Sequence, residues 1–189
     1  MNKKYINIIF SSIIGLGLSI LIGLWFFGSS VFDLNHPAFL FFSYGFFGSL
    51  FFALQNYGTK TELYLSFPFV LIIQMGIMGS STPDSYYLRD FLLITSLFVS
   101  VYLFTLINNK VIGEKKSIVY RALVFSVLYS FCNALFGGIL FIIQSGNFTP
   151  ELSIMIFYAQ FAFLIGFAIS FGFNIYHYLL MKKFAGEGL

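Results

Sequence analysis

Long apolar segments separated by short polar loops are the feature that most constrains how this chain can fold. Six such segments fill nearly all of the 189 residues, and they lie near 6–27, 38–54, 63–78, 91–107, 118–143 and 152–180. A helix needs about 20 apolar residues to cross a bilayer, and a spanning segment must satisfy its own backbone hydrogen bonds. We therefore predict an all-α polytopic membrane protein, a bundle of six transmembrane helices forming one domain over residues 1–189.

The composition agrees with a lipid environment. Hydrophobic residues make up 59% of the chain and charged residues 9%, whereas about a quarter of residues in soluble domains carry charge. Membrane lipid is therefore an expected partner. The net charge of +3 does not indicate nucleic acid as a partner, because all the basic residues except Arg89 lie at one predicted membrane face.

The distribution of charge between the loops predicts the orientation of the bundle. Lys and Arg accumulate on the cytoplasmic side of short loops. Nine basic residues fall at the two termini, in the second loop, or in the fourth loop and the helix start after it: Lys3, Lys4, Lys60, Lys110, Lys115, Lys116, Arg121, Lys182 and Lys183. Arg89 alone lies on the opposite side, whose loops carry Asp33, Asp84, Asp90 and Glu151. We expect both termini in the cytoplasm and the protein in a bacterial cytoplasmic membrane.

The first apolar segment follows a basic start and therefore also has features of a signal peptide. Residues 6–27 are longer than the roughly 7 to 15 apolar residues of a cleavable signal core. We expect the segment to be retained as the first membrane helix. The single cysteine, Cys132, lies inside the fifth segment, so an internal disulfide and a cysteine metal cluster are excluded.

Small residues recur at every fourth position in four of the segments. The stripes are Gly15, Ser19 and Gly23; Gly45, Ser49 and Ala53; Ser126, Ser130, Ala134 and Gly138; and Ala162, Gly166 and Ser170. Such stripes let membrane helices approach closely, because packing contacts hold helices together in lipid. We interpret them as packing inside the bundle, with the interface of a homo-oligomer or of a partner membrane subunit as the alternative.

Three uncharged polar side chains lie deep in the apolar segments, namely Gln74, Asn133 and Gln160. At 1.5 Å per residue, Asn133 and Gln160 lie roughly 12 to 15 Å, and Gln74 roughly 9 Å, from the outer face. All three amides can then face one cavity, with Tyr129 and Tyr158 about one helical turn away or less. We predict that these five residues bind a neutral or weakly polar solute from outside. The alternative is that the amides bridge helices, a contact worth about 0.6 kcal/mol on average.

Several other chemistries lack the groups they need. No Asp, Glu, Lys or Arg lies deep in a predicted span, so proton coupling is not expected. Retinal would need a buried Lys and a membrane haem would need two facing histidines, so no cofactor is predicted. The sequence has no Gly-x-Ser-x-Gly or His-Glu-x-x-His motif, so we assign no catalytic residue and expect no enzymatic activity.

An interfacial metal-dependent enzyme is the remaining catalytic alternative. Its ligands would come from the outer loops, from Asp33, His36, Asp84, Asp90 and Glu151. Loop carboxylates are usually solvated by water, and we expect Arg89 to pair with Asp90 or a neighbouring acid. We therefore predict no metal ligands.

The function predicted from the sequence is transport or solute binding, with a site that opens outward and is not coupled to protons. Six helices with both ends inside and short outer loops over such a site are similar in outline to the substrate-binding membrane subunits of vitamin importers. This similarity is one of topology, and it carries over no residue. The alternative function is a non-catalytic membrane subunit or scaffold. A cavity shared by the amides would favour the first function, and a dry, fully packed interior would favour the second.

Overall fold

The computed structural model is a bundle of α-helices, and it describes residues 3–32, 38–79, 85–107, 117–146 and 152–186. Side chains are described within these ranges except at 75–79, 85–87 and 181–186. The elements are α1 (Lys3–Phe27), η1 (Gly28–Phe32), α2 (Phe39–Tyr57), α3 (Lys60–Gly79), α4 (Ser85–Ile107), α5 (Ile118–Ser145) and α6 (Leu152–Gly186). The prediction of an all-α fold is thereby confirmed.

Five helices are long and apolar enough to cross a membrane. The candidate spans are Lys3–Phe32, which includes η1, and then Phe39–Tyr57, Leu88–Ile107, Ile118–Ser145 and Leu152–Leu180. They indicate a membrane-embedded protein. A sixth crossing would have to be made by α3, which is not among these five within the described residues, and it stays a prediction.

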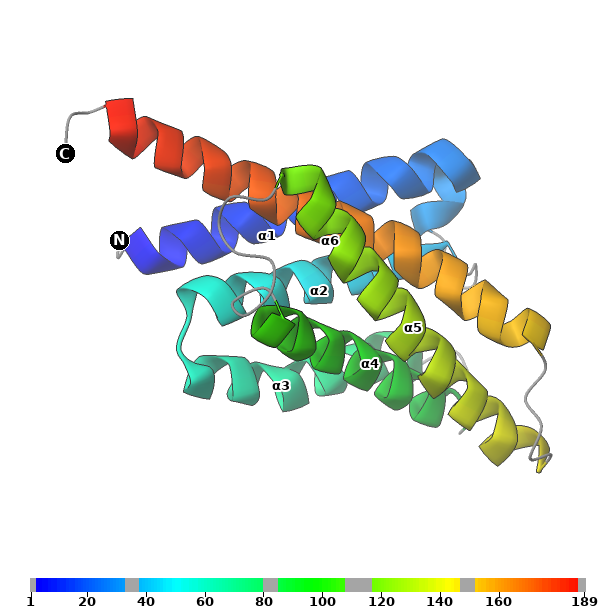
Figure 1. Ribbon diagram of the computed structural model, residues 1–189. Helices are drawn as coiled ribbons and strands as arrows, with labels where there is room; N and C mark the ends of the chain where they lie inside the picture. Colours follow the sequence, from blue (N-terminus) through cyan, green and yellow to red (C-terminus); the bar gives the residue numbers. More distant parts are fainter. Residues whose placement is uncertain (1–2, 33–37, 80–84, 108–116, 147–151, 187–189) are drawn as a thin grey trace.

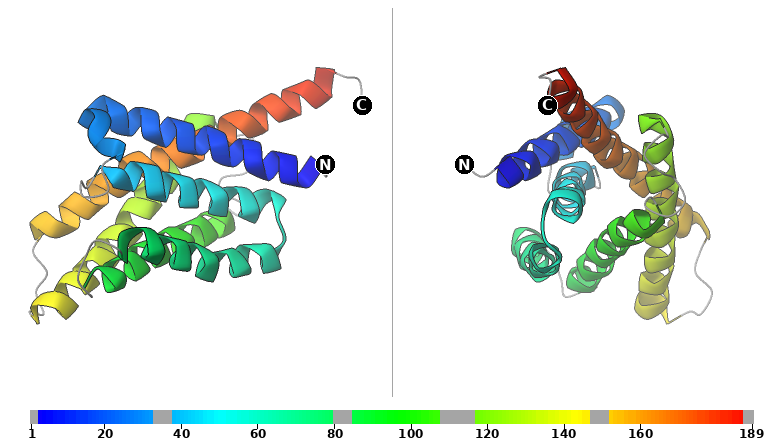
Figure 2. Two further views of the ribbon diagram at one scale, coloured as in Figure 1. Left: turned by 180° about the vertical axis from the view of Figure 1, so that it is seen from behind. Right: turned by 60° about the vertical axis from the view of Figure 1, so that its left-hand side comes forward.

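The two chain termini lie at the same end of the bundle (Figure 1). The turn between α2 and α3 lies at that end too, which we call the terminus end. The opposite end, which we call the η1 end, holds η1, the end of α5 and the start of α6. Figure 2 shows α5 tilted across the other helices and α3 at the edge of the bundle, where it contacts α2 and α4.

Glycine and serine bring α1 into close contact with α2 and α6. Gly15 lies against Ser49 of α2 and against the backbone of Gly172 of α6, so a side chain at Gly15 would overlap its neighbours. The Ser19 hydroxyl donates a hydrogen bond to the backbone oxygen of Phe41 at 2.7 Å. The interpretation of these stripes as internal packing is therefore confirmed at this contact.

The contact between α5 and α6 uses the other two stripes in the same way. Gly166 of α6 lies against the backbone of Ser126 on α5. One turn further along α5, the Ser130 hydroxyl donates to the backbone oxygen of Ala159 at 2.6 Å. Hydrogen bonds from small polar residues to a facing backbone hold membrane helices close together, because lipid offers no competing partner.

Phenylalanine fills the centre of the bundle. Phe52 of α2 is 2% exposed, and its ring centroid lies 5.4, 4.9 and 5.0 Å from those of Phe104, Phe125 and Phe173. These partners come from α4, α5 and α6, so one aromatic cluster joins four helices. Offset and edge-to-face contacts of this kind add to the packing energy of the rings.

The start of α4 differs from the prediction. The fourth segment was predicted at 91–107 with Asp90 in the loop before it, whereas α4 begins at Ser85 and Asp90 is 1% exposed. Asp90 therefore lies two residues inside the candidate span Leu88–Ile107, near its start, so its placement in the loop is wrong. Arg89 forms an ion pair with Asp90, with Nη2 and Oδ1 3.1 Å apart, as predicted. The ion pair reduces the free-energy cost of burying the Asp90 carboxylate. A hydropathy value is assigned to each residue separately and does not include this pairing.

Candidate functional site

Four polar side chains from three helices come together near the η1 end, and we call them the Asp90 cluster: Tyr44 of α2, Gln74 of α3, and Arg89 and Asp90 of α4. Arg89 donates from Nε to Asp90 Oδ1 at 3.1 Å. The Gln74 amide lies beside the Asp90 carboxylate. Tyr44 lies within electrostatic range of both charged residues.

The members of the Asp90 cluster lie at one level of the bundle. Tyr44 lies five residues from the start of α2, Asp90 five residues from the start of α4, and Gln74 five residues before the end of α3. Each is therefore roughly 7 Å along its helix from the η1 end. This shared depth explains how residues far apart in the sequence meet.

Two side chains of the Asp90 cluster are buried and have no hydrogen-bond partner among the described residues. Tyr44 is 2% exposed and Gln74 is 0% exposed. Within the part of the chain that the structure describes, no hydrogen bond reaches Tyr44 Oη, Gln74 Oε1 or Gln74 Nε2. A buried polar group that lacks a partner costs about 1 to 3 kcal/mol. The cluster therefore offers unused donors and acceptors beside a buried ion pair.

Asn133 connects α4, α5 and α6 through hydrogen bonds. Its Oδ1 accepts from the Ser96 hydroxyl at 2.8 Å, and its Nδ2 donates to the backbone oxygen of Tyr158 at 3.0 Å. Asn133 is 5% exposed. Both ends of this amide are thus used between helices, which is the bridging geometry considered as the alternative to ligand binding.

Tyr129 and Tyr158 lie within electrostatic range of members of the Asp90 cluster. Tyr129 of α5 is 2% exposed and within electrostatic range of Tyr44. Tyr158 of α6 is within electrostatic range of Arg89 and Asp90. Its ring lies against Gly137, where any side chain would overlap it. These two aromatic residues therefore lie on the side of the cluster that faces α5 and α6.

Gln160 lies apart from the other predicted site residues. Its side chain is exposed in a groove between α5 and α6 with a volume of about 470 Å³. The groove is lined by Ser130, Ile156, Ala159, Gln160, Phe163 and Leu164. Two residues along an α-helix turn a side chain by about 200°. Gln160 and Tyr158 consequently face different surroundings, although they lie at almost the same depth.

The sequence analysis did not place Tyr44 or Asp90 in the solute site. Tyr44 is one of 12 tyrosines and stands in a segment rich in Phe, so nothing in the pattern distinguishes it. Asp90 carried a usable signal, because an apolar window begins at Leu88 and contains the adjacent opposite charges Arg89 and Asp90. An adjacent pair of opposite charges at the start of an apolar run is compatible with burial at a helix end.

The outer-loop metal site is not assembled among the described residues. Asp33, His36, Asp84 and Glu151 lie outside them, and Asp90 is buried beside Arg89. In the ranges that the structure covers, no three residues among His, Cys, Asp and Glu are grouped so as to hold a metal ion.

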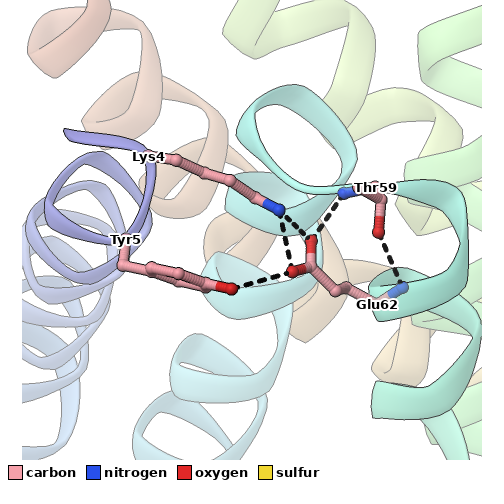
Figure 3. A network of polar contacts seen from close by, with 4 residues as sticks. All are labelled: Lys4, Tyr5, Thr59 and Glu62. Carbon is pink, nitrogen blue, oxygen red and sulfur yellow. Dashed lines mark hydrogen bonds and ion pairs between the residues drawn. The ribbon is translucent and has the colours of Figure 1, made fainter. Parts of the chain in front are cut away.

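A separate polar network at the terminus end connects α1 to the start of α3 (Figure 3). Glu62 Oε2 lies 2.6 Å from Lys4 Nζ and accepts from the Thr59 backbone N–H at 2.7 Å. The Glu62 N–H donates to Thr59 Oγ1 at 3.2 Å, which completes a capping box. Lys4, followed by Thr59, lowers the pKa of Glu62 from 4.5 to about 2. This network anchors two helix ends.

Comparison with known proteins places the chain in no characterised group: no family model, curated protein or solved structure matches it. The functional proposal therefore depends on the arrangement of the side chains.

Proposed function

We propose that this chain is a membrane protein of the solute-binding or transport type, and that the Asp90 cluster is its binding site. The observation that supports this is a pair of buried side chains beside the Arg89–Asp90 ion pair, Tyr44 and Gln74, which have no hydrogen-bond partner in the part of the chain that the structure describes. A bound molecule with both donors and acceptors would satisfy the Tyr44 hydroxyl and the Gln74 amide. It would thereby remove a cost of about 1 to 3 kcal/mol for each unpaired group.

The chemistry of the cluster favours a neutral or weakly polar solute. Arg89 already matches the charge of Asp90, so the groups left without partners are an uncharged hydroxyl and an uncharged amide. An ionic solute would bring an uncompensated charge into a buried site, which is costly. Tyr129 and Tyr158 lie on the side of the cluster that faces α5 and α6 and would supply apolar contact surface. The proposed binding needs no proton transfer, because the ion pair stays intact in it.

The proposal includes six crossings, with the η1 end facing outward and both termini in the cytoplasm of a bacterial cell. The helix starts that carry Lys3, Lys4 and Lys60 lie at the terminus end (Figure 1). Basic residues at one end of a helical membrane protein mark its cytoplasmic side. In this orientation the Asp90 cluster lies in the outer half of the membrane and is reached from outside.

A non-catalytic membrane subunit or scaffold is the second candidate function. It is favoured by the aromatic cluster around Phe52 and by Asn133, whose amide is used between helices. In this function the Asp90 cluster would only help to join α2, α3 and α4. The protein would then bind no small molecule there.

Native mass spectrometry of the protein in mild detergent tests the proposal. The wild type is expected to carry a small molecule that Gln74→Met, which replaces the amide with an apolar chain of similar size, no longer retains. Gln160→Leu is the matched control, because it also removes an amide but lies in the groove between α5 and α6. Wild-type protein without a bound small molecule, or equal retention by Gln74→Met, would contradict solute binding at the cluster.

A further inference from the structure

Gln160 belongs to the face of α6 that points away from the bundle. Ile156 is 46% exposed and Phe157 is 41% exposed, and they lie four and three residues before Gln160 on the same helix face. Gln160 lies eight residues into the candidate span Leu152–Leu180. At 1.5 Å per residue this is roughly 12 Å along the helix, within the depth that hydrocarbon occupies.

The Gln160 amide has no hydrogen-bond partner among the described residues. No hydrogen bond reaches it from the side chains and backbone that the structure describes. The Ser130 hydroxyl, which also lines the groove, donates to the backbone oxygen of Ala159. Lipid chains offer no hydrogen-bonding group, so an amide exposed to them is destabilised. A structure that places Gln160 here needs a polar partner outside the chain.

A second copy of this chain would supply such a partner. A primary amide has both an acceptor oxygen and donor N–H groups, so it is complementary to itself. In a two-fold dimer the same surface of both copies meets, and each Gln160 would donate to the other across the axis. The groove of about 470 Å³ beside Gln160, which is also lined by the small residues Ser130 and Ala159, leaves room for a facing helix to approach.

We propose that the groove between α5 and α6 is a homodimer interface in which the Gln160 side chains of two protomers form reciprocal hydrogen bonds. A lipid chain can fill the groove but cannot satisfy the amide. An unrelated helix would have to carry a polar residue at the same depth in the membrane. In a two-fold dimer the second copy presents its own Gln160 at that depth. The interface is independent of solute binding at the Asp90 cluster, which involves other helix faces.

Disulfide crosslinking in membranes tests the predicted proximity. A disulfide requires Cα atoms about 4 to 7 Å apart, so Gln160→Cys should yield a covalent dimer under mild oxidation. The wild type is a direct control, because its single cysteine, Cys132, is buried. Ile139→Cys is the matched control, since Ile139 is 44% exposed on α5 but does not line the groove. Monomeric Gln160→Cys, or equal crosslinking of Ile139→Cys, would overturn the proposal.

The strength of dimerisation in lipid vesicles gives a second test. Gln160→Leu removes two amide hydrogen bonds and should raise the dimer dissociation constant roughly fivefold to tenfold. Leucine suits a lipid-facing helix position, so the protomer should still fold. Gln144→Leu makes the same change in the last turn of α5, outside the groove, and should leave dimerisation unchanged. An unchanged dissociation constant for Gln160→Leu would overturn the proposal, and solute retention by the same variant reports separately on the proposed function.

Discussion

Removing the hydroxyl of Tyr44 and that of Tyr57 should have different effects on the free energy of unfolding. Among the described residues, Tyr44 has a buried hydroxyl without a partner, whereas the Tyr57 hydroxyl lies 3.0 Å from His177 Nδ1. In solute-free protein, Tyr44→Phe should therefore leave the free energy of unfolding unchanged or raise it by about 1 kcal/mol. Tyr57→Phe should lower it by roughly 0.5 to 1.5 kcal/mol. Thermal unfolding in detergent measures both, and a clear loss for Tyr44→Phe would show that its hydroxyl is bonded.

The ion pair between Lys4 and Glu62 predicts a pH dependence of stability. The pKa of Glu62 is lowered from 4.5 to about 2 in the folded protein, chiefly by Lys4. Because the folded value is below the unfolded one, the contribution of the carboxylate is present above pH 4.5 and is lost as the pH falls toward 2.

We expect Glu62→Gln to melt below the wild type near neutral pH, with a difference that shrinks over that acidic window. Gln keeps an oxygen that can accept from Thr59, so the comparison isolates the charge. Lys4→Met should show the same pattern, because it removes the other partner. A difference in melting temperature that stays constant from pH 6 to pH 2 would contradict this assignment.

Among the helices, the contact of α1 with α2 and α6 gives the sharpest prediction. A side chain at Gly15 would overlap Ser49 and approach α6, whereas a Cβ at Gly17 meets nothing within 4 Å. Gly15→Leu should destabilise the protein by about 1 to 3 kcal/mol through overpacking. Gly17→Leu on the same helix should be neutral or stabilising by up to about 1 kcal/mol, since Leu favours helix over Gly. Unfolding in detergent distinguishes them, and equal effects would argue against this packing.

The sequence pattern predicted the positions of the helices better than it predicted which side chains face one another. Length and hydropathy located the helices, because backbone satisfaction in lipid needs no partner from elsewhere in the chain. They did not give the direction in which each helix faces, so Gln160 was grouped with residues of the interior. The start of α4 was misplaced because the pairing of Arg89 with Asp90 makes a charged turn compatible with burial.

For the whole molecule, the number of crossings depends on α3. Lys60 and Lys115 are separated by α3 and α4, and Ser29 and Lys60 are separated by α2. Since α4 and α2 are candidate spans, Lys60 and Lys115 share a membrane face only if α3 also crosses. Ser29→Cys, Lys60→Cys and Lys115→Cys, made one at a time and labelled in intact cells with a membrane-impermeant maleimide, show which membrane face each position occupies.

We expect labelling at 29 in intact cells, and labelling at 60 and 115 only after the cells are opened. Cys132 is buried and gives the background signal. Labelling of 60 and 115 from opposite faces would remove the sixth crossing. Gln74 would then no longer lie at a fixed depth in the membrane, and its place beside Asp90 would lose its physical basis. The assignment of the solute site thus depends on α3 crossing the membrane, and α3 is not among the five candidate spans within the described residues.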